Sequence, residues 1–272
     1  MDTVFPAPSA TAFEAIAAIV SAALYLIVGV AALAHAPKDI RARVFFATAL
    51  ASAAPYSVTA LIWARGSAAA FRAPVVIVVG LSLMLGSLTL FHFTQVFPWR
   101  RPWIRAHARW LHWGYVGAAA AAGTAAWMYA GAFGDVGTAG SGGLQVTSVA
   151  VGDAALAMAL LLIVVPGLFV LGIAVPFSAL WSLYKTWLAA RAAGIEAARV
   201  TTYWILVSQM AGGVLTILII PLLRLVAPIG PWVTIAAVLL FGFSLLMPIA
   251  FAAGVFRYRL LDLNPDGLPA VK

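Results

Sequence analysis

Residues 11–34 read TAFEAIAAIVSAALYLIVGVAALA, and residues 35–43 continue as HAPKDIRAR. The first stretch carries a single charged side chain, Glu14, and is longer than the roughly 20 residues that a helix needs to cross a bilayer. The second stretch holds three basic residues and one acidic residue. An apolar run that ends in a short basic connection is typical of a transmembrane helix whose end lies in the cytoplasm.

Long apolar runs followed by short connections repeat along the whole chain. Apolar residues make up 64% of the 272 positions and charged residues only 9%, whereas a soluble domain has about 25% charged residues. Lipid offers no hydrogen-bond partners to the backbone, and the runs are long and not alternating, so helices are expected and not a barrel. The sequence therefore predicts one all-α membrane domain, residues 1–272, made of seven transmembrane helices. The predicted spans are about 11–34, 44–64, 74–97, 111–133, 155–184, 203–223 and 232–256.

The distribution of basic residues predicts how these spans are oriented. Thirteen of the sixteen lysines and arginines follow spans one, three, five and seven, and the other three lie on the opposite side. The positive-inside rule places the thirteen in the cytoplasm, and an odd number of spans then places the N-terminus outside. The thirteen are Lys38, Arg41, Arg43, Arg100, Arg101, Arg105, Arg109, Lys185, Arg191, Arg199, Arg257, Arg259 and Lys272, against Arg65, Arg72 and Arg224.

Two segments depart from a plain bundle of helices. The fifth predicted span is the longest and contains Pro166 and Pro176, which remove backbone donors and predict a bent or tilted helix. The outer connection at about 134–154 is rich in glycine and holds Asp135 and Asp153. A flexible connector and a ligand lid both remain open for it.

Composition excludes several function classes. The chain has no cysteine, which excludes disulfides, thiolate metal sites, covalently attached haem and thiol catalysis. The net charge of +8 is explained by basic cytoplasmic connections that face anionic lipid headgroups, so no nucleic-acid partner is expected. The first fifteen residues contain no basic region, which argues against a cleaved signal peptide.

Ionisable side chains are scarce within the predicted spans. The lysines Lys38, Lys185 and Lys272 all lie outside the bilayer core, so a retinal Schiff base is not expected. Only Glu14 and Arg224 lie within or next to spans, both near the outer ends, and coupled ion transport usually needs such groups deeper. Glu14 is interpreted as an interfacial side chain, with an outer cavity as the alternative.

His92 is the one histidine well inside a predicted span, at a depth of about 8 Å from its inner end. The other histidines lie in or beside connections, so a haem held by two histidines is a poor match. Thr89, Gln95 and Gln209 are predicted to lie near His92, because span six runs in the opposite direction to span three. We interpret the four as a polar cluster that joins helices. Axial binding of a chlorophyll magnesium, another metal or a lipid ligand remains open.

Two further groups of residues are candidates for contacts. In span four, small residues recur every four positions, a spacing that lets helix backbones approach closely, and two partners remain open, another span and another protein. Tryptophans and arginines after span three are predicted to form a cytoplasmic interface anchored at the headgroups, with a pigment or partner contact as the alternative. The small residues are Gly114, Ala118, Ala122 and Ala126, and the interface comprises Trp99, Arg100, Arg101, Trp103, Arg105, Arg109, Trp110 and Trp113.

Three stretches resemble the seven-helix N-terminal sensor region of bacterial histidine kinases and related signalling proteins. Residues 88–103, LTLFHFTQVFPWRRPW, are similar to the end of a span in that family, where a His-Phe pair precedes Phe-Pro and basic residues. Residues 183–207, LYKTWLAARAAGIEAARVTTYWILV, resemble its basic connection between spans five and six. Residues 250–264, AFAAGVFRYRLLDLN, resemble its exit from span seven into the output domain.

The resemblance implies a sensor-like bundle in the bacterial cytoplasmic membrane. The family feeds a cytoplasmic output domain, whereas only fifteen residues follow Arg257 here, so no kinase or other enzyme activity is expected. The predicted function is a receptor-like module that acts through contacts with membrane or cytoplasmic proteins. The alternative is an accessory structural subunit of a larger respiratory or photosynthetic complex, and a membrane enzyme that acts on lipid is the weakest possibility.

Overall fold

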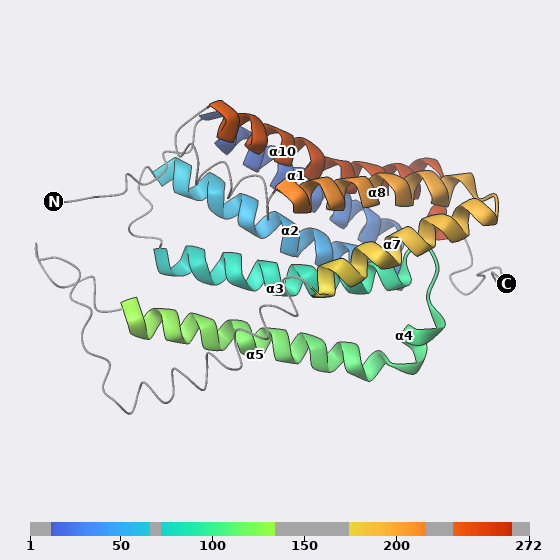
Figure 1. Ribbon diagram of the computed structural model, residues 1–272, viewed down its shortest axis with the longest axis horizontal. Coiled ribbons are helices and arrows are strands. Elements are labelled where there is room, and N and C mark those ends of the chain that lie inside the picture. The colour runs from blue at the N-terminus through green and yellow to red at the C-terminus, as the bar shows by residue number, and fades with distance from the viewer. Residues whose placement is uncertain (1–11, 66–71, 134–173, 216–230, 263–272) are drawn as a thin grey trace, which may run out of the picture.

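The computed structural model describes residues 12–65, 72–133, 174–215 and 231–262, and within these ranges the chain is helical with no β-strand (Figure 1). The prediction of an all-α fold is therefore confirmed for the described residues. The long helices are α1 (Ala12–His35), α2 (Ile40–Arg65), α3 (Arg72–Val96), α5 (Ala108–Phe133), α7 (Val175–Ala192), α8 (Glu196–Val214) and α10 (Pro231–Ala252). The short elements are α4 (Pro102–Ala106), the π-helix η5 (Ala253–Arg257) and the 3₁₀-helix η6 (Leu260–Asp262).

Two described helices are long and apolar enough to cross a membrane. They are the stretches Ala15–His35 in α1 and Val238–Arg257 at the end of α10 and in η5.

Six of the long helices form a closed ring, and the seventh lies beside it. Around the ring α1 packs against α2, α2 against α3, α3 against α7, α7 against α8, α8 against α10, and α10 against α1. Helix α5 packs mainly against α3 and lies at the edge of the bundle (Figure 1). Gly114 and Ala118 of the predicted small-residue face point toward α3: Ala118 is buried against Met84 and Leu88. The side chains of Ala122 and Ala126 lie outside the described residues.

A close approach of two described helices involves α1 and α2, which the small-residue pattern did not single out. A Cβ atom added to Gly29 would lie 2.9 Å from the Cβ of Ala49 and 3.3 Å from the ring of Phe46. Real Cβ atoms do not approach so closely, so glycine at this position permits the observed separation of the two helices.

The connection between α7 and α8 is a tight turn, shorter than the interval from about 184 to 203 that separates the predicted spans. Gly194 has a φ of +67°, and the N–H of Ile195 donates to the carbonyl of Ala190 at 3.0 Å. The N–H of Gly194 donates to the carbonyl of Arg191 at 3.2 Å, which completes a Schellman motif. Both helices thus continue past the apolar segments that were predicted as spans.

This correction moves three basic residues from a loop onto helices. Lys185 and Arg191 lie on α7, and Arg199 lies in the first turn of α8, where it pairs with Glu196. Hydropathy marks only the apolar part of a helix, whereas the glycine cap marks its end. Pro176 lies in the first turn of α7, where a missing N–H is tolerated, and Pro166 lies outside the described residues.

A proline inside α10 creates a buried link between the first and last long helices. Pro248 has no N–H, so the carbonyl of Ser244, four residues earlier, lacks its helical donor. The hydroxyl of Tyr25 on α1 donates to this carbonyl at 2.9 Å, and Tyr25 is buried. A polar group from α1 thus replaces the hydrogen bond that the proline removes.

We expect Tyr25→Phe to lower the free energy of unfolding by about 1 kcal/mol, because the Ser244 carbonyl would lose its donor in a buried position. Thermal unfolding of the detergent-solubilised protein, followed by tryptophan fluorescence, measures the change. Tyr203→Phe is the matched control, because Tyr203 is 44% exposed. Equal stability of the two variants would contradict the role of the hydroxyl.

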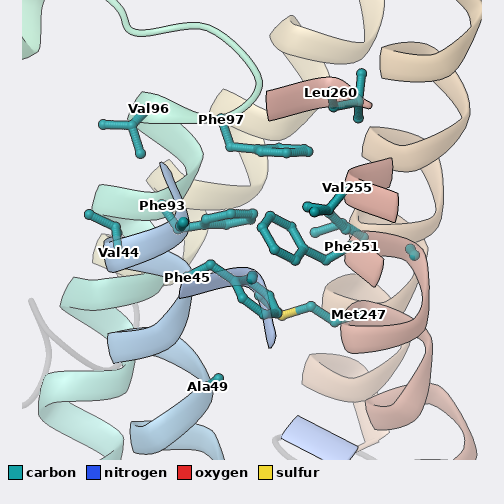
Figure 2. Packing of buried hydrophobic residues seen from close by; sticks show 14 of the residues in the cluster. Val44, Phe45, Ala49, Phe93, Val96, Phe97, Met247, Phe251, Val255 and Leu260 are labelled. Atoms are coloured by element: carbon teal, nitrogen blue, oxygen red, sulfur yellow. The ribbon is translucent and has the colours of Figure 1, made fainter. Parts of the chain in front are cut away.

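Four phenylalanines pack together in the core at the end of the bundle where α3 and α10 terminate. Phe45 and Phe251 stack with their ring centroids 3.5 Å apart, and Phe93 and Phe97 stack at 4.9 Å (Figure 2). Phe251 also contacts Phe93 at 5.6 Å and Phe97 at 5.3 Å, and all four rings are fully or almost fully buried. This phenylalanine cluster joins α2, α3 and α10 directly beneath the polar site described next.

Candidate functional site

The start of α2 holds a buried arginine that the sequence analysis assigned to a cytoplasmic loop. Arg41 is 1% exposed. Asp39 precedes α2 and caps it, because its Oδ1 accepts the backbone N–H of Arg41 at 2.8 Å. The same carboxylate pairs with the Arg41 guanidinium, with Nη2 and Oδ2 2.7 Å apart. One acidic residue thus starts the helix and neutralises the buried charge.

The guanidinium of Arg41 also binds the backbone of two distant segments. Its Nη1 donates to the carbonyls of Pro98 and Leu260, each at 3.0 Å. Its Nη2 donates to the carbonyl of Leu261 at 2.5 Å. Arg41 therefore fastens the start of α2 to the loop after α3 and to the segment after α10. We call this arrangement of Arg41, Asp39 and the three carbonyls the Arg41 clamp.

Arginine suits this position for a geometric reason. A buried charge is stable only where hydrogen bonds and an opposite charge replace its hydration, and the planar guanidinium fork offers five donors. The described bonds use Nε, Nη1 and Nη2 together, and the Asp39 carboxylate is 17% exposed. A lysine has a single ammonium group, which cannot reach carbonyls on two segments and a carboxylate in the same geometry.

The segment held by the clamp, Ala253–Asp262, is called here the exit segment. It begins where α10 widens into the π-helix η5, and Arg259 then turns the chain with a φ of +51°. Leu260 and Leu261 are buried, whereas Arg257 and Tyr258 are exposed. The exit segment therefore folds back onto the bundle and does not extend away from it.

Gly254 allows the exit segment to lie against α8. A Cβ atom at this position would lie 2.9 Å from Cδ1 of Leu260, 2.9 Å from Cγ2 of Thr201 and 3.0 Å from its Oγ1. The space between η5 and α8 is thus filled, and a side chain at residue 254 would push Leu260 or α8 away.

Gly254→Ala is expected to lower the free energy of unfolding by about 2 kcal/mol, because added volume in a packed contact is destabilising. Gly242→Ala on the same helix should not destabilise the protein, since a Cβ there meets nothing within 4 Å. Alanine in fact has the higher helix propensity. Unfolding midpoints of both variants test this prediction, and a stable Gly254→Ala protein would argue against the close contact.

A second polar group joins the end of α3 to α7. Gln95 is buried, and its Nε2 donates to Oγ of Ser182 at 2.9 Å. The guanidinium of Arg101 donates to the carbonyl of Ser182 at 2.8 Å and to Oγ1 of Thr186 at 2.9 Å. Burial lowers the pKa of Arg101 from its ordinary value. The Arg41 clamp and this group therefore hold the loop after α3 from opposite sides.

The four residues predicted to form one polar cluster are placed at separate contacts. Nδ1 of His92 lies 3.1 Å from the hydroxyl of Tyr115 on α5, whereas Gln95 bonds to α7. Nε2 of Gln209 lies 3.0 Å from the sulfur of Met247 on α10. The Thr89 hydroxyl donates within α3, to the carbonyl of Gly86 at 3.0 Å.

These separate contacts correct the predicted single cluster. The prediction paired His92 with Gln209 because the two were expected at a similar depth in the bundle. In the ring of helices, however, α7 lies between α3 and α8, so Gln209 on α8 faces α10 instead of His92. His92, Gln95 and Gln209 each connect two helices, which agrees with a role in joining helices. Among the described residues no group of three or more His, Asp or Glu side chains is arranged to hold a metal ion.

Only some of the residues in the predicted cytoplasmic interface are exposed. Trp99 is 4% exposed and belongs to the main core, so its assignment as a headgroup anchor was wrong. Trp103, Trp110 and Trp113 are exposed, at 44%, 72% and 67% respectively. Trp99 is buried because the backbone after α3 turns back over the bundle, where Arg41 binds the carbonyl of Pro98.

The arginines of this interface differ in their surroundings. Arg109 is exposed on α5, and Arg101 bonds to α7. Nε of Arg100 is buried and, within the described part of the chain, has no hydrogen-bond partner. The side chain of Arg105 lies outside the described residues, as do the side chain of Glu14, the connection at 134–154, Arg224 and Lys272.

The Arg41 clamp and Gly254 were not identified from the sequence. A signal existed for part of the clamp, because the aspartate of KDIRAR stands directly before a helix and two residues before Arg41. Nothing local indicated that Leu260 and Leu261, more than two hundred positions away, would supply the carbonyls.

Comparisons place no known protein beside this architecture. Neither protein-family models, nor curated proteins, nor solved structures gave a match to this chain, so its function is argued from its own geometry.

Proposed function

We propose that the chain is a seven-span protein of the bacterial cytoplasmic membrane, with its N-terminus outside. The apolar outer surface of the bundle supports this. Large apolar side chains on the outward face of α1 are about half exposed or more, and such a surface is unfavourable in water and favourable in lipid. They are Ile16, Ile19, Val20, Ile27 and Val30.

The arrangement of basic residues supports the proposed orientation. Successive long helices run in opposite directions, so the turns after α1, α3 and α7 lie at the same end as the exit segment, on the right in Figure 1. These turns and the helix ends beside them carry most of the lysines and arginines. A cytoplasmic location of this end follows from the positive-inside rule.

The absence of cysteine makes the topology directly testable. Single-cysteine variants Lys38→Cys and Arg191→Cys mark the basic end, and Arg65→Cys marks the opposite end. A membrane-impermeant maleimide should label Arg65→Cys in intact cells and should label the other two only in inverted vesicles. Labelling of all three from one side, or the reverse pattern, would refute the orientation.

Within the membrane we infer a receptor-like, non-catalytic module that acts through protein contacts at its cytoplasmic end. The observation that carries this inference is the Arg41 clamp. Arg41 lies at the start of α2 and binds both the loop after α3 and the exit segment. A shift of α2 or of α3 therefore changes the position of the exit segment. The resemblance to sensor regions of histidine kinases supports the same role for the exit.

A pull-down with matched variants tests the receptor-like role. The wild-type protein, extracted in a mild detergent after cross-linking, should carry a cytoplasmic signalling protein that is identified by mass spectrometry. Arg41→Ala should weaken the association, whereas Arg43→Ala should preserve it, because Arg43 is exposed and its Nε donates to the nearby carbonyl of Pro37, outside the clamp. Failure to capture such a protein, or equal capture by both variants, counts against the proposal.

One observation favours the alternative, an accessory subunit of a larger respiratory or photosynthetic complex. Among the described helices, α5 packs mainly against α3 and exposes Trp110, Trp113 and Val116 on its other faces. Such a helix is suited to contact another membrane subunit. Native mass spectrometry distinguishes the two functions: a fixed complex with respiratory or photosynthetic subunits supports the alternative, and a free chain opposes it.

A further inference from the structure

An open groove with a volume of about 260 Å³ lies between α8 and the end of α10, beside the exit segment. One wall follows a single face of α10 and η5, with Leu246, Ile249 and Ala253 at helical spacing. Trp204 lines it from α8. These seven residue steps along α10 correspond to a length of about 10 Å. A narrow apolar groove of this length, smaller than the roughly 300–1,000 Å³ of a drug-sized pocket, fits one alkyl chain.

The groove also contains a buried polar group without a partner. Thr201 on α8 lines it and is 2% exposed, and its Oγ1 has no hydrogen-bond partner among the residues that the structure describes. A buried hydroxyl that makes no hydrogen bond costs about 1–3 kcal/mol. This hydroxyl packs toward Gly254 and has almost no accessible surface, so the groove offers a bound chain mainly apolar side chains.

The end of the groove next to the exit segment is positively charged. Tyr258 lines the groove, and the guanidinium of Arg257 lies over its ring at 5.6 Å from the centroid. Arg259 is exposed two residues further along the chain, and one exposed acidic residue, Asp262, follows it. On α8 the carboxylate of Glu196 is already paired with Arg199. An anionic group is thus the complementary occupant.

We propose that this groove binds one acyl chain of an anionic phospholipid, with the phosphate beside Arg257. The assignment rests on the proposed membrane location, since lipid reaches the groove from the bilayer. Ala253, Arg257 and Tyr258 belong to the exit segment, so the lipid binds that segment and α8 together. Bound lipid therefore favours the position in which the Arg41 clamp holds the exit segment.

Native mass spectrometry of the full chain in detergent tests the site, with dioleoyl phosphatidylglycerol and dioleoyl phosphatidylcholine as the two probes. We expect tighter binding of the anionic lipid to the wild-type protein. Arg257→Gln should weaken this binding roughly tenfold, because it removes a charged hydrogen-bond donor to the phosphate. Arg43→Gln, which removes an exposed charge outside the groove, should bind the lipid as the wild type does. Ala253→Phe, which fills the groove, should abolish binding.

Equal affinity for the two lipids, or equal effects of Arg257→Gln and Arg43→Gln, would overturn the site. Lipid binding at the wild-type level by a folded Ala253→Phe protein would overturn it as well. If Ala253→Phe does not fold, the comparison of Arg257→Gln with Arg43→Gln tests the site. The cysteine-labelling experiment is independent of these results. A correct labelling pattern together with a failed lipid titration removes the lipid site and leaves the proposed topology in place.

Discussion

Arg41→Ala is expected to release the exit segment from the bundle and to lower the free energy of unfolding by about 3 kcal/mol. The variant removes the donors to the carbonyls of Pro98, Leu260 and Leu261, and it leaves the Asp39 carboxylate without its cation. Unpaired buried carbonyls are costly, so the segments that carry them should move to positions where water can reach them.

Hydrogen–deuterium exchange measures this release directly. Amides of Arg259–Asp262 and of the loop after α3 should exchange faster in Arg41→Ala than in the wild type, whereas the centre of α1 should be unchanged. Arg41→Lys should behave almost like Arg41→Ala, because the charge is kept but the guanidinium fork is lost. Arg43→Ala, with its exposed side chain, serves as the control, and unaltered exchange in Arg41→Ala would contradict the clamp.

Phe251→Ala is the second variant expected to have a large effect, with a loss of about 3–4 kcal/mol in the free energy of unfolding. Phe251 is fully buried and contacts Phe45 on α2 and Phe93 and Phe97 at the end of α3. Removing its ring leaves a cavity between helices that the stiff backbone cannot close, so dispersion contacts are lost on all sides. This loss does not depend on whether water or lipid surrounds the bundle.

The control for this variant is Phe177→Ala, since Phe177 is 70% exposed on α7. Both proteins lose the same atoms, so the difference in their unfolding midpoints reports packing alone. Phe251→Leu, which keeps part of the volume, should fall between the wild type and Phe251→Ala. A Phe251→Ala protein as stable as the Phe177→Ala protein would show that the cluster contributes little.

The positions of the helices were predictable from the sequence to different degrees. The apolar run at 11–34 matches α1 within one residue at each end, because apolar side chains fill it from end to end. The connection between α7 and α8 is shorter than the interval between the predicted spans, since its helices continue through basic and polar residues that hydropathy does not recognise. Gly194 and the acidic Glu196 were the local signals that mark the true turn.

The candidate site was less predictable, because it depends on contacts between distant segments. Arg41 was assigned to the aqueous side on the basis of its charge, and only the folded chain brings it to the carbonyls of Leu260 and Leu261. His92 and Gln209 were matched by depth along their helices. Depth fixes the height of a residue in a bundle but not which neighbour it faces, and that depends on the order of helices around the ring.

Composition and periodicity alone specify an all-helical chain with an apolar exterior, because hydropathy and backbone hydrogen bonding act locally along the sequence. The basic residues at alternate ends of the helices also follow from sequence order, and they predict which side faces the cytoplasm. Tertiary packing decides which charged residues are buried: Arg41 is enclosed because Asp39 and three backbone carbonyls surround it. The first apolar run thus predicts a membrane helix by itself, while the function of the basic turn that follows it depends on the whole bundle.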